Sequence, residues 1–431
     1  MRILVLGGYG LIGGAITTAL LAAGHDVTGL GRSVAMARSR WPQARWLACD
    51  LQDLANREAW LPLLDGIEAV VNAAGVLQDG PGDDVAKVQA SAMIALFAAC
   101  AEAGVSRVVQ ISAAGAAADA STLFMRSKAQ ADAALKASSL DWIILRPGLV
   151  IGAPAYGGTA MLRGLAALPG LIPLPAGTPT LQTVALDDVS AAAVGAVEGR
   201  VPSRRSYDLL EERGHSLAVI VAALRASLGF APARLVEWPL PLFRLCFRLG
   251  DLAGWLGWRS PMRTTALIQI EGGISGDPRP WIEATGRPLR SLPETLAALP
   301  SSVQERWFAR LFLLKPMIIV TLASFWLASG LIGLWQREAA EAVLVTRGVA
   351  PWLAEAFVLA GALLDIALGA AMLRQRTMAI AAFGMIAVTA GYLAAGTVLT
   401  PGLWVDPLGP FVKTLPAALL ALVALAVREG R

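Results

Sequence analysis

The chain has 431 residues, a length that predicts two or three domains rather than a single core. Its net charge is only +4, and its basic residues are scattered, which excludes the electrostatic pattern of a nucleic-acid-binding protein. Three separated cysteines and two histidines form no CxxC pair and no zinc-ligand spacing. We therefore expect neither a disulfide framework nor a metal site.

Short apolar strands alternate with Ala-rich helical stretches from residue 1 to about 150, beginning with ILVLG and ending with DWIILRPG. This rhythm predicts βαβ units, and strands that are apolar throughout predict burial on both faces. The sequence therefore predicts an α/β fold with a doubly wound parallel sheet over 1–150. Met1 leads directly into the first strand without a secretory leader, so we expect this domain to lie in the cytoplasm.

A glycine-rich turn, with Gly7, Gly10 and Gly13, joins the first strand to the first helix. The first glycine permits the tight turn, the second lets the backbone approach a pyrophosphate, and the third allows close packing of helix and strand. The helix N-terminus then faces the phosphates. The motif predicts a Rossmann dinucleotide-binding domain, in which Leu11 and Ile12 of the same turn also contact the cofactor.

The second predicted strand, DVTGLGRS, ends in Arg32 and Ser33, and Arg32 lies nineteen residues after Gly13. An NAD-preferring site usually has an acid at this place to bind the ribose hydroxyls, whereas a guanidinium and a hydroxyl suit a 2′-phosphate. We therefore expect NADP(H) as the preferred cofactor and NAD(H) as the alternative. The competing interpretation is that Arg32 is an ordinary exposed loop residue.

Residues 151–310 lose the strand–helix rhythm and are rich in Pro and Gly. We expect the remainder of the nucleotide-binding domain here, with a small α+β cap over the carboxyl ends of the strands, where open α/β sheets bind ligands. The stretch PLPLFRLCFRLGDLAGWLGWRSP interleaves leucines and aromatics with arginines. It predicts either an amphipathic helix at a bilayer interface or an ordinary packing face.

Four hydrophobic stretches follow within residues 311–431 and predict an all-α four-helix transmembrane bundle. Met317 to Trp335 and Thr377 to Leu399 are uncharged and long enough to cross a hydrocarbon core of ~30 Å, whereas Pro351 to Leu373 and Pro407 to Val427 each contain charge. The distribution of Arg in the loops favours a cytoplasmic position for both ends of the bundle. We therefore expect a multi-pass protein of the cell inner (cytoplasmic) membrane.

Residues 1 to about 300 resemble the short-chain dehydrogenase/reductase superfamily through GGYGLIGG, ACDLQD, VVNAAG, VVQISAAG, RSKAQAD and LRPGLVIG. They are most similar to its atypical NAD(P)-binding branch, which includes the Rossmann-fold accessory subunit of respiratory complex I. The resemblance implies an acid that reaches the adenine, an Asn-Ala-Ala-Gly turn under the cofactor and a Pro-Gly turn beside the nicotinamide. The implied cofactor-binding residues are Asp50, Leu51, Asn72, Ala73, Ala74, Gly75, Pro147 and Gly148.

The same resemblance implies a catalytic group from which this chain departs. Reductases of the superfamily use a Tyr four residues before a Lys to exchange a proton with the substrate oxygen, and a Ser positions that oxygen. Here Ser112 and Lys128 are present, but the tyrosine position is Phe124, and only Tyr156 is placed where a cap loop could return a phenol to the site. We expect Ser112 and Lys128 to bind the cofactor, and their catalytic role stays open.

The C-terminal stretches FWLASGLIGLW, GALLDIALGAAML and LWVDPLGPFVKTLP resemble the DoxX-like membrane domain, whose relatives are tied to quinone-linked redox functions. Because an ionisable residue within a membrane span is costly, Asp365, Lys413 and Lys315 are functional candidates. The alternative is a buried pair or hydrogen bond that fixes helix packing.

Together these features predict a membrane-anchored NADP(H)-binding redox protein with a hydrophobic substrate, a quinone or a lipid, delivered from the bilayer. Because Phe124 has no proton to give, the alternative is a non-catalytic NADPH-binding assembly or structural protein. A nucleotide-sugar epimerase or dehydratase is less favoured, since it normally needs the same tyrosine. No residue pattern identifies a protein partner.

Overall fold

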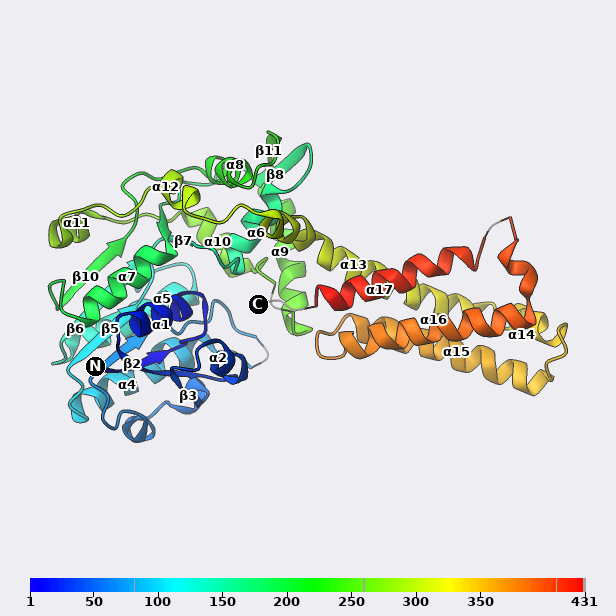
Figure 1. The fold of residues 1–431 in the computed structure, drawn as a ribbon, viewed down its shortest axis with the longest axis horizontal. Coiled ribbons are helices and arrows are strands. Elements are labelled where there is room, and N and C mark those ends of the chain that lie inside the picture. Colours follow the sequence, from blue (N-terminus) through cyan, green and yellow to red (C-terminus); the bar gives the residue numbers. More distant parts are fainter. Residues whose placement is uncertain (81, 259, 408, 429–431) are drawn as a thin grey trace. The chain divides into compact units, whose positions relative to one another are not determined.

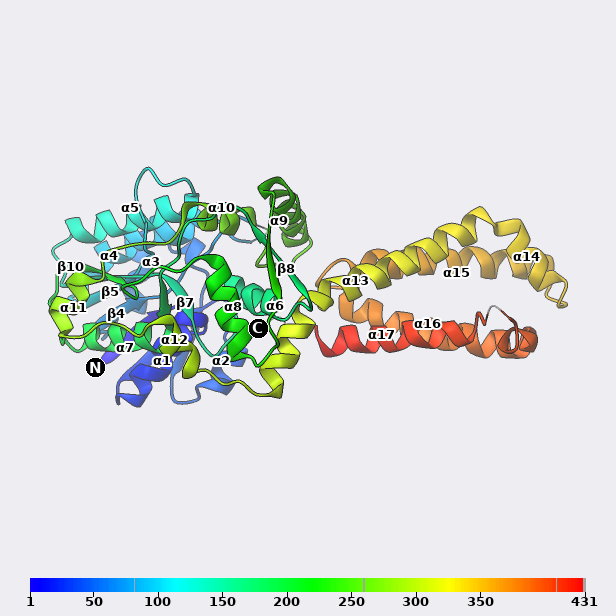
Figure 2. The ribbon, with the colours of Figure 1, turned by 90° about the horizontal axis from the view of Figure 1, so that it is seen from above.

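The computed structural model describes residues 1–80, 82–258, 260–407 and 409–428. Its internal contacts divide the chain into two units, Met1–Asp251 with Pro261–Ala309 and Leu252–Ser260 with Arg310–Arg431. Each unit is described by itself, and Figures 1 and 2 show the elements of both.

A parallel sheet of seven strands, counted over the described residues, forms the centre of the first unit, in the order β10-β6-β5-β4-β1-β2-β3. Strand β1 has β2 on one side and β4 on the other, so the chain reverses its direction of winding at the carboxyl end of β1. Ligands bind at such switch points in open α/β sheets. The strands are β1 (Arg2–Leu6), β2 (Asp26–Gly31), β3 (Arg45–Ala48), β4 (Ala69–Asn72), β5 (Arg107–Ile111), β6 (Trp142–Pro147) and β10 (Arg205–Leu209).

Helices cover both faces of this sheet (Figure 1), which confirms the predicted doubly wound fold. In β1, Ile3 and Val5 lie on the face of the sheet that is covered by α1 (Leu11–Ala22) and α7 (Leu186–Val197). The alternate residues Leu4 and Leu6 lie on the opposite face, in a second hydrophobic cluster. This alternation follows from the two-residue period of a strand. The helices of the second face include α3 (Arg57–Trp60), α4 (Ala92–Glu102) and α5 (Leu123–Ala137), and α2 (Ala35–Arg40) adjoins the first.

A separate hydrophobic cluster supports the smaller α+β part that the sequence predicts after residue 150. It contains two sheets of two strands each, β11-β8 and β7-β9, within the described residues. Its elements are β7 (Leu149–Ile151), α6 (Gly157–Ala166), β8 (Leu171–Pro175), β9 (Thr183–Ala185), α8 (Leu217–Ser227), β11 (Arg234–Trp238), α9 (Leu240–Trp255), α10 (Thr264–Gly272), α11 (Arg279–Thr285) and α12 (Leu292–Ala297).

The second unit is helical, and its helices run alongside one another (Figure 2). In the described part of the chain, three helices are long and apolar enough to cross a membrane: α13 (Val303–Trp335), α15 (Pro351–Met372) and α16 (Met378–Leu399). The short α14 (Arg337–Val345) follows α13.

The fourth expected span forms a shorter helix, α17 (Leu415–Ala426), of 12 residues, which is about 18 Å long. Pro416 lies in its first turn, and a proline there disfavours extension of the helix toward the N-terminus. The end of α17 nevertheless lies beside the N-terminal half of α13, since Lys315 Nζ donates to the carbonyl of Arg428 at 3.0 Å. Short single turns complete the structure: η1 (Leu51–Asp53), η2 (Leu61–Leu63), η3 (Lys87–Ser91), η4 (Pro401–Trp404) and η5 (Val412–Thr414).

Candidate functional site

The glycine turn lies at the carboxyl end of β1, and two of its glycines are required by geometry. Gly7 has a φ of +66°, and a Cβ there would lie 2.9 Å from Ala74 Cα, whereas a Cβ on Gly13 would lie within 2.1 Å of Gly7 O. Gly10 precedes α1 and provides no side-chain cap. The first N–H groups of α1 are therefore available to a phosphate. They belong to Leu11, Ile12 and Gly13.

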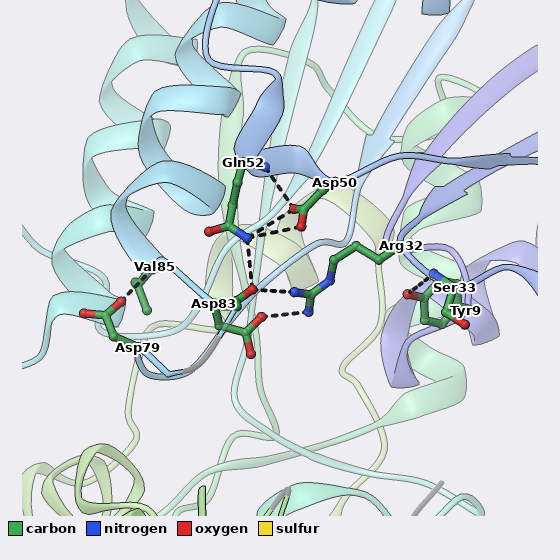
Figure 3. Close-up of polar contacts among 9 residues, drawn as sticks. Tyr9, Arg32, Ser33, Asp50, Gln52, Asp79, Asp83 and Val85 are labelled. Carbon is green, nitrogen blue, oxygen red and sulfur yellow. Dashed lines mark hydrogen bonds and ion pairs between the residues drawn. The ribbon is translucent and has the colours of Figure 1, made fainter. Parts of the chain in front are cut away.

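Arg32 lies at the end of β2 and is held by the loop that follows β4 (Figure 3). Its guanidinium forms an ion pair with Asp83 at 2.7 Å and donates to the carbonyl of Gly82 at 2.7 Å. Gln52 bridges to the same carbonyl at 3.0 Å, and its backbone N–H donates to the carboxylate of Asp50 at 3.1 Å. The structure thus brings Arg32 and Asp50 into one polar cluster, and Asp83 and Gln52 are members that the sequence did not predict.

Ser33 and Leu51 border this polar cluster. The backbone N–H of Ser33 donates to the Tyr9 hydroxyl at 3.3 Å, and the Tyr9 ring packs so closely on Gly31 that a Cβ there would overlap it. Leu51 is buried in η1, directly after Asp50. Its place is therefore against the core, while the Ser33 side chain is exposed.

The Asn-Ala-Ala-Gly turn (72–75) is fixed to Lys128 of α5. Asn72 Nδ2 donates to Gln110 Oε1 at 2.8 Å, and Asn72 Oδ1 accepts from the backbone N–H of Ala74 at 3.0 Å. Lys128 Nζ donates to the carbonyls of Ala74 and Ile111, each at 3.0 Å. An ammonium has three donors, and these two bonds use two of them.

Burial lowers the pKa of Lys128 to about 8, because the side chain has lost its water and Asp132 offsets only part of that loss. Only 5% of Lys128 is exposed. The group therefore loses its proton near neutral pH much more readily than a lysine in water.

The hydroxyl of Ser112 is committed to a buried carboxylate. Ser112 Oγ donates to Asp132 Oδ2 at 2.9 Å, and Arg146 forms an ion pair with the same oxygen at 3.0 Å. Burial raises the pKa of Asp132, and the charge of Arg146 opposes that rise. Asp132 lies one helical turn after Lys128 on α5, a spacing that the sequence analysis did not use. Ser112 is thus held in position by a group that the resemblance did not imply.

The Pro-Gly turn after β6 is close-packed. A Cβ on Gly148 would lie 2.5 Å from the carbonyl of Gln182, and Pro147 accepts a hydrogen bond from the backbone N–H of Ala114 at 3.1 Å. Since Ser112 lies two residues before Ala114, this turn is joined to the end of β5.

A cavity of about 460 Å³ lies in the first unit beside Phe124, at the position of the superfamily tyrosine. Leu77, Val85, Leu123 and Phe124 form its apolar wall. Tyr156 precedes α6, is 39% exposed and is not among the described residues that line the cavity. The role of Tyr156 as a substitute phenol stays a prediction.

The polar wall of the cavity comes from α9, α10 and the loop after β4. Gln78 Nε2 donates to Asp251 at 3.0 Å, and the Thr265 hydroxyl donates to Gln78 Oε1 at 2.9 Å. Arg263 Nε also donates to Asp251 at 3.0 Å, so this carboxylate is well satisfied. The lining also includes Asp79, Arg248 of α9 and Thr264. These residues converge from parts of the chain that the sequence analysis did not connect.

A second polar cluster lies within the helical unit. Asp365 of α15 is 5% exposed and accepts hydrogen bonds from Ser329 of α13 at 2.7 Å and from Tyr392 of α16 at 3.1 Å. Lys413, another of the predicted intramembrane candidates, is exposed in η5. The cluster therefore joins the three long apolar helices through hydroxyl groups rather than through a lysine.

Among the described residues, no group of three or more His, Cys, Asp or Glu is arranged to hold a metal ion.

Comparisons with known proteins agree with both halves of this description. The NAD(P)H-binding family matches residues 7–173, and the DoxX-like family matches residues 323–422. A 3-diazoavenalumate denitrifying reductase from a Streptomyces species is 33% identical over 46% of this chain and 72% of its own length.

Solved structures with the same fold include the Bordetella bronchiseptica enzyme WbmH in complex with NAD⁺, which is 17% identical with a TM-score of 0.52. The match covers 72% of this chain and 97% of WbmH. The Thermus thermophilus UDP-glucose 4-epimerase in complex with NAD is 20% identical with a TM-score of 0.51, over 69% of this chain and 98% of the epimerase. The chain belongs to the NAD(P)H-binding family that includes the Streptomyces relative, has the fold of short-chain-dehydrogenase-like proteins, and carries a DoxX-like domain in its C-terminal part.

Proposed function

We propose that this protein is a membrane-anchored NADP(H)-dependent oxidoreductase that reduces a hydrophobic, quinone- or lipid-like acceptor. The observation that carries the proposal is the cavity beside Phe124, with its apolar wall of leucine, valine and phenylalanine side chains. Phe124 lies one helical turn before Lys128, which holds the turn expected under the cofactor. A ring-shaped apolar acceptor fits such a cavity better than a sugar does.

The absence of a phenol at position 124 selects among acceptors. Bound NADPH supplies a hydride, and a quinone that accepts it becomes a quinol anion that takes its proton from water. Such a reaction balances with one hydride and one proton and needs no side-chain acid. A simple carbonyl, in contrast, depends on a general acid in the transition state. The name of the Streptomyces relative, a denitrifying reductase, supports a reductive activity for this family.

The preference for NADP(H) rests on Arg32, which lies in one cluster with Asp50 at the carboxyl edge of the sheet. We place the nucleotide-binding domain and the C-terminus on the cytoplasmic side of the inner membrane. The hydrogen bond from Lys315 to Arg428 supports this topology, because it brings the C-terminal end back to the start of the first span. Arg374 and Arg376 follow α15 and fit the positive-inside rule at the same end.

The proposal is tested with full-length protein reconstituted in lipid nanodiscs and supplied with NADPH and a short-chain quinone analogue. We expect quinone-dependent oxidation of NADPH, followed by its absorbance. The control is Gly13→Ala, whose added Cβ would overlap Gly7 O and close the phosphate turn. NADPH that stays unoxidised with every quinone analogue in a bilayer would contradict the proposal.

The variant Phe124→Tyr distinguishes the proposed reductase from a non-catalytic NADPH-binding protein. The second function is the alternative because Phe124 has no proton to give to a substrate. We expect the new phenol, one turn from Lys128, to raise the rate of carbonyl reduction by about 100-fold or more over that of the parent. This is the usual contribution of a general acid. Quinone reduction by the parent should persist in the variant. A parent that is inactive with all acceptors, together with an active Phe124→Tyr variant, would instead indicate an NADPH-binding assembly protein. An epimerase is less supported, since it would need that phenol in the parent.

A further inference from the structure

One face of α9 is apolar and open. Leu242, Leu245, Leu249 and Leu252 recur every three or four residues, so they share one side of the helix. Their exposed fractions lie between 49% and 59%. The opposite side packs on its own domain through Phe247, which is buried. A soluble domain rarely exposes such a contiguous stripe, so this face is expected to have a partner.

The chain that leaves α9 is fixed to the end of a spanning helix. Trp258 Nε1 donates to the carbonyl of Leu373 at 2.6 Å, and the backbone N–H of Gln375 donates to the carbonyl of Leu256 at 3.2 Å. All four residues belong to the second unit. Since α15 is long enough to cross the hydrocarbon core and ends at Met372, the proposed membrane anchoring puts this junction at a bilayer surface.

Charge and aromatic side chains surround the leucine stripe as they do in interfacial helices. Arg244 and Arg248 lie on the flank of the stripe, and Trp255, at the C-terminal end of α9, is exposed. Arg374 and Arg376 are exposed at the junction itself. Leucines on one side with arginines and tryptophan beside them are typical of a helix that lies in the headgroup region of an anionic membrane.

We propose that α9 lies in the bilayer interface, with its four-leucine stripe buried among lipid chains and the exposed Arg374 and Arg376 of the junction at anionic headgroups. The occupant of this face is therefore the lipid surface, and the membrane contact of the protein extends beyond its spanning helices. Because α9 also supplies Arg248 and Asp251 to the cavity, an acceptor dissolved in the bilayer surface would meet the cavity wall directly. This last step rests on the proposed function, whereas the position of α9 does not.

Cys246 provides a native reporter, since it is exposed and lies one turn after Leu242. An environment-sensitive fluorophore is attached to it in the full-length Cys49→Ser protein, in nanodiscs that contain phosphatidylglycerol and a lipid with a shallow nitroxide. The control carries the label at Met36→Cys in a Cys49→Ser, Cys246→Ser background, because Met36 of α2 is 75% exposed. We expect several-fold stronger quenching by the nitroxide lipid at Cys246 and several-fold stronger quenching by aqueous iodide at the control site.

Equal iodide quenching at the two sites, without lipid quenching at Cys246, would overturn the proposal. A paired Leu245→Glu and Leu249→Glu variant is expected to lose most of the lipid quenching at Cys246. Neither leucine lines the cavity, so NADPH binding by this variant reports whether the fold is intact. If the nitroxide lipid quenches the label at Cys246 but the protein has no quinone reductase activity, only the proposed function is contradicted. If the protein reduces quinones but the lipid does not quench the label, only the position of α9 is contradicted.

Discussion

Replacing Arg32 by aspartate is expected to weaken NADPH binding by roughly 10- to 150-fold, while NADH binding changes little. A charge-assisted hydrogen bond to a 2′-phosphate contributes about 1.5–3 kcal/mol, and the substitution removes it. The new carboxylate would also stand beside Asp83, which pairs with Arg32 in the parent. The measurement is a fluorescence titration of full-length protein in detergent with each nucleotide.

A substitution of Asp83, the ion-pair partner of Arg32, is a matched control that should change the affinity for NADPH in the opposite direction. A 2′-phosphate must compete with this carboxylate for Arg32, so Asp83→Asn should tighten NADPH binding. The pair is more than one-third exposed on both sides, which limits the gain to about 0.2–1 kcal/mol, or up to about fivefold. If Arg32→Asp leaves the affinities for both nucleotides unchanged, Arg32 is an ordinary loop residue and the proposed NADP(H) preference is wrong.

Local patterns were sufficient to predict the sheet and the close-packed glycine turn after its first strand. The apolar runs of β1 and its neighbours are dictated by burial on both faces, and Gly7 and Gly13 are dictated by close backbone approach. Each of these features depends on residues near one another in the chain. The resemblance added the identity of Lys128 and of the turn that it holds.

The contacts that the sequence left unpredicted join distant segments. Ser112, Asp132 and Arg146 meet only because β5, α5 and β6 are neighbours in space. The cavity needs α9 and α10 beside Phe124, and their register against α5 has no local signal. Within the helical unit, Asp365 was singled out by its cost in a membrane, but its partners Ser329 and Tyr392 depend on how three helices pack.

Lys128→Met is expected to change how stability depends on pH. The pKa of Lys128 is about 8 in the folded protein and 10.5 in the unfolded chain, because burial disfavours the charged form. Between these values the unfolded chain binds more protons, so this lysine makes the parent more stable as pH rises from about 8 to 10. Below pH 8 it carries its full penalty, roughly 3 kcal/mol for a fully buried group.

The substitution also removes the two hydrogen bonds that Lys128 donates, which leaves the carbonyls of Ala74 and Ile111 without that donor. Leaving each buried carbonyl without its donor costs about 1–3 kcal/mol, whereas removing the buried charge stabilises the folded protein. Because the two effects oppose each other, the change in the free energy of unfolding at a single pH does not test the pKa of Lys128. The dependence of stability on pH is not affected by this loss, because the methionine side chain has no titratable group. Thermal unfolding of full-length protein should therefore show an unfolding midpoint that rises between pH 8 and pH 10 in the parent, relative to the midpoint of Lys128→Met at the same pH.

Lys136→Met is the matched control, since Lys136 lies on the same helix and is exposed. Its unfolding midpoint should depend on pH as that of the parent does. Parallel curves for the parent and Lys128→Met would mean that Lys128 keeps an ordinary pKa in the folded protein.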